Sequence, residues 1–295
     1  MVNIWINSLG CLTEIQTERE ISAEAFRQLV KERKDRLKEG GLGRDNCIAI
    51  EMNSSIDSLV TLFAVWSVGD IAALLAPNLP KREKDHLLGE CEADYFWTLE
   101  GELEKLSEER KPSAERSRDF MGPGTILFTS GSHSLGKACF HSLNRLNARI
   151  ETLKGQFSNP EMSHTLCFLP LNFGHGLIGN CLLPLMSGQH LILNPLIETM
   201  VPSKFRKIVN DFGITFVSAT PSIWRILLKA NSERGWGSSI QRIHCASEPF
   251  FPAIYVAMRE VFVNAKIFNV YGLTELGSWV SGACISEFGL DGSNH

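Results

Sequence analysis

Apolar positions along the chain follow two patterns that alternate with each other. Short runs of apolar, often β-branched residues predict β-strands, and longer stretches with helical spacing predict amphipathic helices. The predicted strands are 47–51, 71–75, 93–99, 125–128, 165–170, 190–193, 214–219, 240–246 and 266–270. The predicted helices are 22–39, 56–68, 81–91, 142–157, 176–187, 204–212, 221–230 and 251–263. This alternation predicts an α/β fold with mostly parallel sheets.

Two segments depart from the simple alternation. Residues 58–77 have the length of a membrane span and carry one charge, Asp70. Gly69 and Asp70 interrupt the run, and Pro77 ends it, so we expect a buried helix followed by a buried strand and no membrane span. Residues 100–118 are polar and charged, and they predict a surface linker.

Composition narrows the class of protein. The chain has 295 residues, 44% of them hydrophobic and 21% charged, which is typical of a globular protein. A net charge of −4 gives no basic field that would attract nucleic acid. The eight cysteines lie far apart without a C-x-x-C pair, and the first residues lack the basic and then apolar pattern of a signal peptide. We therefore expect reduced thiols and a cytoplasmic protein.

A loop of small and hydroxyl residues carries the first chemical signal. After the predicted strand 125–128, the chain reads Thr129-Ser130-Gly131-Ser132 and reaches Lys137 five residues later. Small residues let backbone N–H groups crowd a phosphate chain, and a lysine adds a positive charge. A flexible turn is the alternative. A P-loop is disfavoured because Ala138 stands where that motif needs a hydroxyl, and the residues that follow are strand-like.

A second motif identifies the family that the loop resembles. Residues 269–275 read Asn-Val-Tyr-Gly-Leu-Thr-Glu, and together with Thr129–Ser132 and Lys137 they resemble the adenylate-forming superfamily. That superfamily includes acyl-CoA synthetases, firefly luciferase and adenylation domains of nonribosomal peptide synthetases. His133, Ser134, Gly136 and Ala138 depart from its loop pattern. The resemblance implies catalytic roles for Lys137, Thr274 and Glu275, with Glu275 also holding Mg²⁺. It implies an ATP or AMP site made of Thr129, Ser130, Gly131, Ser132, Ser247, Glu248, Pro249, Asn269, Tyr271, Gly272 and Thr274.

Two further segments resemble the family's substrate-binding regions. Residues 169–188 are similar to its P-L-x-H-x-x-G segment, and residues 245–250 are similar to its G-G-E/A-P-L segment. The resemblance implies an acid pocket formed by Phe173, His175, Leu177, Phe250 and Trp279. Two of these have a structural alternative: His175 as a hydrogen-bonded histidine in a turn, and Trp279 as a core residue.

The resemblance, which extends over about residues 20–282, also implies the architecture. We expect two subdomains of αβα layers, approximately 47–165 and 1–46 together with 166–285. The family's small barrel, its C-terminal lid domain and the lysine of that domain do not follow Glu275 in this chain. We therefore expect the chain alone to bind ATP but to form adenylate slowly.

The implied activity is ATP-dependent conversion of a carboxylic acid to an acyl-adenylate, for transfer to the thiol of CoA or of a phosphopantetheine carrier. Adenylation domains for α-amino acids place an aspartate after the aromatic residue of the third motif, but Gly174 follows Phe173. A buried substrate ammonium would lack its partner, so we expect an acyl or aryl acid. The expected partners are that acid, and a carrier protein or a separate C-terminal domain. The alternative function is a weak or inactive relative that binds nucleotide or acyl ligands and acts as a regulator or scaffold.

Overall fold

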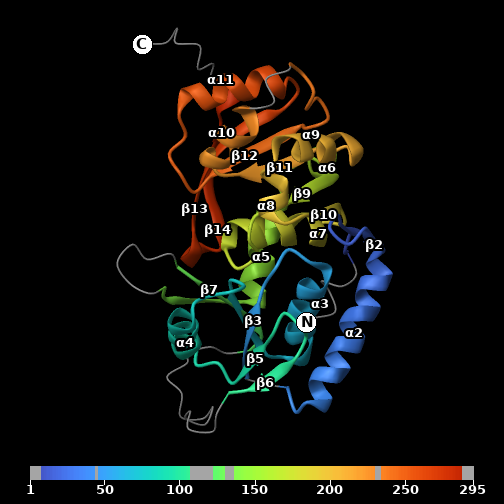
Figure 1. The fold of residues 1–295 in the computed structure, drawn as a ribbon, viewed down its shortest axis with the longest axis vertical. Helices are drawn as coiled ribbons and strands as arrows, with labels where there is room; N and C mark the ends of the chain where they lie inside the picture. The colour runs from blue at the N-terminus through green and yellow to red at the C-terminus, as the bar shows by residue number, and fades with distance from the viewer. Residues whose placement is uncertain (1–7, 44–45, 107–121, 130–135, 230–233, 288–295) are drawn as a thin grey trace.

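The polypeptide forms two stacked halves, each built on its own sheet (Figure 1). The structure is a computed structural model that describes residues 8–43, 46–106, 122–129, 136–229 and 234–287. Both sheets are mostly parallel with helices packed on them, so the predicted α/β class is correct. Strands 47–51, 71–75 and 190–193 and helix 56–68 have the bounds that the sequence predicts.

The upper half in Figure 1 contains an eight-stranded sheet within the described residues. Its strands lie in the order β14 (Ser278–Cys284), β13 (Lys266–Leu273), β12 (Arg242–Ala246), β11 (Phe216–Ala219), β9 (His164–Cys167), β10 (His190–Leu193), β1 (Leu12–Glu14) and β2 (Arg19–Ile21). The helical segments that precede or connect these strands are α6 (Asn159–Met162), η2 (His175–Leu182), α7 (Leu183–Met186), α8 (Leu196–Thr199), α9 (Pro202–Asp211), α10 (Pro221–Lys229), α11 (Pro252–Val261) and η3 (Thr274–Leu276), and η4 (Ile285–Glu287) follows β14.

The lower half contains a six-stranded sheet within the described residues. Its order is β6 (Leu103–Lys105), β5 (Tyr95–Trp97), β3 (Cys47–Glu51), β4 (Ile71–Leu75), β7 (Gly124–Phe128) and β8 (Ala138–Ser142). Its helices are α2 (Ala23–Glu39), α3 (Ile56–Val68) and α4 (Lys81–Glu90), and α5 (Leu143–Lys154) follows β8. The Ser22 hydroxyl caps α2, and Gly69 ends α3 with a φ of 99°.

Five strands have the same order and directions in both sheets. The sequence β5-β3-β4-β7-β8 in one sheet matches β11-β9-β10-β1-β2 in the other, and each ends in an antiparallel pair. In the six-stranded sheet, β4 pairs on one side of β3 and the next strand, β5, pairs on its other side. In the eight-stranded sheet, β10 and β11 flank β9 in the same way. Such a switch point opens a crevice at the carboxyl ends of the strands, where ligands of α/β proteins bind.

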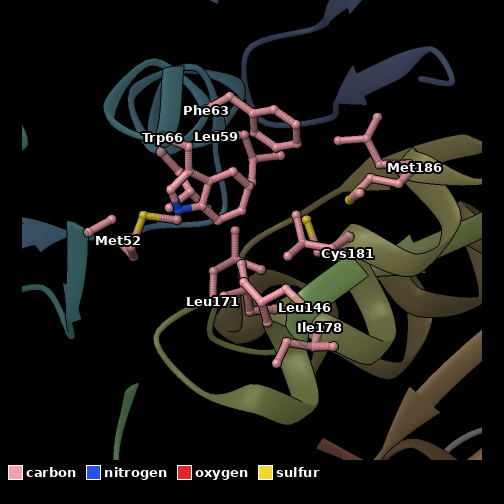
Figure 2. Close-up of a cluster of buried hydrophobic side chains, with 14 of the residues drawn as sticks. Met52, Leu59, Phe63, Trp66, Leu146, Leu171, Ile178, Cys181 and Met186 are labelled. Atoms are coloured by element: carbon pink, nitrogen blue, oxygen red, sulfur yellow. The ribbon is translucent and has the colours of Figure 1, made fainter. Parts of the chain in front are cut away.

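A shared hydrophobic core joins the two halves. Figure 2 shows Met52, Leu59, Phe63 and Trp66 of the lower half facing side chains of the upper half and of α5, among them Leu146, Leu171, Ile178, Cys181 and Met186. The indole N–H of Trp66 donates to the Gly124 carbonyl and to the Thr125 hydroxyl, both at 3.1 Å. The sheets are therefore held as one packed unit, and the predicted subdomain boundaries stay a prediction.

Three local expectations need correction. The segment predicted as helix 176–187 begins as the π-helix η2 and becomes α-helical at Leu183. Strand β13 continues through Leu273 because it pairs with β14, so Tyr271 and Gly272 lie on a strand. Leu103–Lys105 of the predicted linker forms β6, and residues 107–118 lie outside the described part. No helix in the described ranges is long and apolar enough to cross a membrane.

Candidate functional site

The first candidate site lies at the switch point of the eight-stranded sheet. A cavity of about 610 Å³ opens at the carboxyl ends of β9, β11 and β12. Its walls include Pro170 after β9, Thr220 after β11 and Ser247 after β12, and residues 272–275 and 278–279 close another side. Parallel strands bring these sequence-distant segments to one edge, as the switch-point geometry predicts.

A second cavity of about 690 Å³ adjoins the first. Its walls are residues 247–250, 269–272 and 281–283. Ser247 and Gly272 line both cavities, so the two form neighbouring compartments. A Cβ at Gly272 would lie 2.7 Å from the Ser278 carbonyl oxygen, so only glycine fits this shared wall.

The nucleotide residues predicted from the sequence divide between these compartments. Thr129, Gly272, Thr274 and Glu275 line the first cavity, and Glu248, Pro249, Asn269, Tyr271 and Gly272 line the second. Tyr271 is 58% exposed, which leaves its ring free to contact a ligand. Ser130, Gly131 and Ser132 lie outside the described residues. The exposed Lys137 is not among the lining residues, although its backbone closes the loop through bonds with Thr129 of 3.1 and 3.2 Å.

The oxygen donors of the first cavity fit magnesium with phosphate. Glu275 supplies a carboxylate, and Thr129 and Thr274 supply hydroxyls on the same cavity. Within the described residues, no group of three metal-ligating side chains forms a complete cage. Mg²⁺ is usually held by one or two carboxylates together with substrate phosphates, and this donor set has that character.

His175 forms a hydrogen-bonded centre in the wall of the first cavity. Its ring bonds the Ser247 hydroxyl through Nδ1 at 3.1 Å and the Ser218 hydroxyl through Nε2 at 2.6 Å. The ring keeps a partial accessible surface because it borders the cavity, but protein atoms surround it closely. This burial lowers the pKa of His175 to about 4. The imidazole is therefore neutral near pH 7 and offers no charge to a bound acid.

Trp279 closes the cavity floor and also belongs to the core. It is 4% exposed and packs edge-on against His244, with ring centroids 4.4 Å apart. A Cβ at Gly179 would lie 2.6 Å from the indole, so the glycine makes room for it. Trp279 is therefore both a pocket residue and a core residue, which the sequence analysis gave as alternatives.

Two predicted acid-pocket residues lie elsewhere. Leu177 has no exposed surface and packs into the core shared by the two halves, because the π-helix turns it away from the cavity. Phe250 lines the second cavity, beside Tyr271, and does not line the first. Phe173 and His175 do line the first cavity, and Phe173 is 43% exposed.

Glu248 has a structural partner beside the second cavity. Its carboxylate accepts from the Ser222 backbone N–H at 3.0 Å and from the Ser222 hydroxyl at 2.5 Å, at the start of α10. Burial alone would raise the pKa of Glu248, but these hydrogen bonds lower it overall. The carboxylate is thereby held ionised against α10.

A charged cluster that sequence reasoning missed lies behind the floor. Arg242 donates to the His244 ring at 2.9 Å and pairs with Glu161 at 3.3 Å. Its guanidinium lies 3.9 Å from the ring centroids of both Phe157 and Phe268. Burial, and then the charge of Arg242, hold the pKa of His244 well below its usual range. Side chains two positions apart on a strand share a face, so the spacing of Arg242 and His244 on β12 could have indicated this cluster.

Comparison with known proteins agrees with this architecture. The family described as "AMP-binding enzyme" matches residues 11–294. The N-terminal subdomain of NpsA from Klebsiella oxytoca, in complex with 3-hydroxyanthranilyl-AMSN, superposes with a TM-score of 0.77 at 18% identity over 96% of this chain and 75% of that chain. The o-succinylbenzoate CoA synthetase of Bacillus subtilis gives 0.79 at 17% identity, over 96% of this chain and 60% of that chain.

The curated relatives include synthases that are much longer than this chain. N-(5-amino-5-carboxypentanoyl)-L-cysteinyl-D-valine synthase of Penicillium rubens is 23% identical over 255 residues, covering 79% of this chain and 7% of the synthase. The chain therefore spans a small part of such a relative. The fold defines the class, which is that of the N-terminal subdomain solved for NpsA. The chain belongs to the AMP-binding enzyme family, which confirms the resemblance seen in its motifs.

Proposed function

We propose that this chain binds ATP and a carboxylic acid in its two adjoining cavities and joins them as an acyl-adenylate. The observation that carries the proposal is the shared wall of Ser247 and Gly272 between the two compartments. A ligand with its adenosine in the second cavity and its acyl group in the first would extend past Ser247 and Gly272, the residues that line both cavities. The α-phosphate would then lie beside Thr274 and Glu275, which line the first cavity.

The chain's residues would act by positioning and by neutralising charge. A carboxylate and an ATP phosphate repel each other, so their approach needs preorganised cations and hydrogen-bond donors. Glu275 would hold Mg²⁺, which supplies positive charge at the phosphates when bound. The Thr274 hydroxyl would donate to the α-phosphate, and Thr129 with Lys137 would orient the terminal phosphates. Tyr271 would lie against the adenine ring.

The acid pocket favours a compact acid without an α-amine. Gly174 borders the cavity without a carboxylate, and the neutral His175 adds no charge. Trp279 closes the floor, which leaves an aromatic ring or a short acyl group as the best fit. The NpsA subdomain, solved with 3-hydroxyanthranilyl-AMSN, supports an aryl acid by its similar fold.

The activated acid would be transferred to a thiol. An acyl-adenylate is a mixed anhydride, and the thiol of CoA or of a phosphopantetheine carrier would displace AMP from it. An acyl-CoA synthetase and a dimodular nonribosomal peptide synthase both occur among the relatives. The alternative of a regulatory or scaffold protein gains no support from these comparisons. The cytoplasmic location stays a prediction.

Calorimetric titration of the 295-residue chain tests the proposal. The ligands are MgATP and 5′-O-(N-aroylsulfamoyl)adenosine, a stable mimic of an aroyl-adenylate. We expect both to bind, and the mimic to bind more tightly because it occupies both cavities. Pyrophosphate exchange with a panel of aryl, fatty and amino acids then identifies the substrate class. A chain that binds neither ligand would overturn the proposed function.

A further inference from the structure

The turn that presents Thr274 and Glu275 is held by side chains from another part of the chain. This turn, residues 274–277, follows β13 of the eight-stranded sheet. His141 comes from β8 of the six-stranded sheet, and its ring lies close to the Thr274 backbone. Arg149 comes from α5, and its Nε donates to the Gly277 carbonyl at 3.3 Å. The two ends of the turn are thus each contacted from outside their own sheet.

Packing around Gly277 brings the two side chains together. An atom built at the Cβ position of Gly277 would lie 3.7 Å from His141 Nδ1 and 3.8 Å from Arg149 Cγ. These are ordinary van der Waals distances, so the two side chains cover this side of the turn without strain. His141 is only 5% exposed. The contact therefore restrains the turn by packing as well as by the Arg149 hydrogen bond.

The stability of the fold alone does not explain the burial of the Arg149 guanidinium and the His141 ring. Nη2 of Arg149 is buried and has no hydrogen-bond partner among the described residues. Burial lowers the pKa of Arg149 and also that of His141. Burying a guanidinium nitrogen without a partner is unfavourable. Costs of this kind are found where a side chain is needed to fix a functional geometry.

The same strand leads back to the phosphate loop. His141 lies four positions after Lys137, and in the β7–β8 pair it stands opposite Thr125. Thr129, at the start of the loop, donates its N–H to the Lys137 carbonyl at 3.1 Å. The hairpin therefore fixes the ends of the loop and, through His141, the turn that carries Glu275. The ends of the loop and the turn belong to different sheets, and among the described residues no strand pairing joins them directly.

We propose that His141 and Arg149 are positioning residues that hold Thr274 and Glu275 in register with Thr129 and Lys137. This inference rests on the proposed function, because the register matters only if one ligand spans both segments. A displacement of about 1 Å in a positioned group can cost about a hundredfold in rate. Neither residue lines the ligand cavities, so both act through the turn.

The test compares the affinity for ATP with magnesium present and with EDTA present. In Arg149→Met we expect the enhancement of ATP affinity by magnesium to fall about tenfold, with ATP affinity in EDTA changed by less than about threefold. Arg149→Lys keeps the charge but loses the planar donor, and we expect it to behave like Arg149→Met. His141→Gln serves as an independent variant that retains a hydrogen-bonding side chain, and we expect a smaller loss than in His141→Phe.

Lys154→Met is the matched control, because Lys154 carries the same charge at the last position of the same helix, α5. We expect it to bind ATP as the unmodified chain does in both conditions. If Arg149→Met also kept the full magnesium enhancement, or weakened binding equally with and without magnesium, the positioning role would be refuted. If the unmodified chain failed to bind MgATP, the proposed function would fail first, and this inference with it.

Discussion

Ser247 allows a prediction in which two substitutions at one position separate backbone strain from hydrogen bonding. Ser247 has a φ of 72°, in the left-handed region that disfavours side chains with a Cβ. Its hydroxyl bonds His175 at 3.1 Å, and it lines both cavities. A strained residue that also contacts a site residue points to a functional reason for keeping serine.

The magnitudes follow from these two features. Ser247→Ala keeps the strain and loses the hydrogen bond, which destabilises the fold by about 1 kcal/mol. Ser247→Gly loses the same bond but relieves about 1 kcal/mol of strain, so its stability stays close to that of the unmodified chain. The glycine variant should therefore be about 1 kcal/mol more stable than the alanine variant. For a chain of this size that difference corresponds to about 2–3 °C in Tm.

Thermal and urea unfolding of both variants measure this difference. Ser218 provides the control, because it bonds the other nitrogen of His175 at 2.6 Å from within strand β11. Glycine in a strand is less favourable than alanine, so the order should reverse, with Ser218→Ala more stable than Ser218→Gly. Finding Ser247→Ala as stable as Ser247→Gly would refute the strain argument. Both Ser247 variants should also weaken acid binding more than MgATP binding, since His175 loses its support.

Three further outcomes are expected. Glu275→Gln should weaken MgATP binding at least about tenfold by calorimetry without lowering Tm, because Glu275 is a cavity residue outside the core. Gly174→Asp should fold, since a Cβ there meets its nearest atom at 3.5 Å; in pyrophosphate exchange it should reduce turnover of aryl acids about a hundredfold and raise that of α-amino acids. The pKa of His175 is about 4 in the folded protein, below its ordinary value of 6.5, because burial favours the neutral ring. The folded state therefore keeps its full stability above pH 6.5, and the free energy of unfolding decreases as the pH falls from 6.5 toward 4. With allowance for screening by cavity water the loss is about 2 kcal/mol, and urea unfolding of His175→Gln should show a correspondingly flatter pH dependence.

The sequence by itself determined the family and most of the helices and parallel strands, but strands β1, β2, β6, β8 and β14 were not predicted. Strands such as 47–51 and 71–75 are short apolar runs whose side chains are buried on both faces, so their pattern alone marks their bounds. The motifs at 129–137 and 269–275 are local in sequence, and they predicted the residues that line the two cavities at Thr129, Tyr271, Thr274 and Glu275. Local patterns could identify these because each motif lies on one loop or one strand end.

The tertiary structure decided which side chains face one another. The contacts of His175 with Ser218 and Ser247 join positions that are far apart in the sequence, and only the parallel order of β9, β11 and β12 brings them to one edge. Leu177 was predicted in the pocket, but the π-helix directs it into the core. Arg149 reaches the 274–277 turn across 128 sequence positions. A sequence motif specifies residue types and their spacing along one segment. Which side chains of two distant segments contact each other depends on the strand order and on the packing between the sheets.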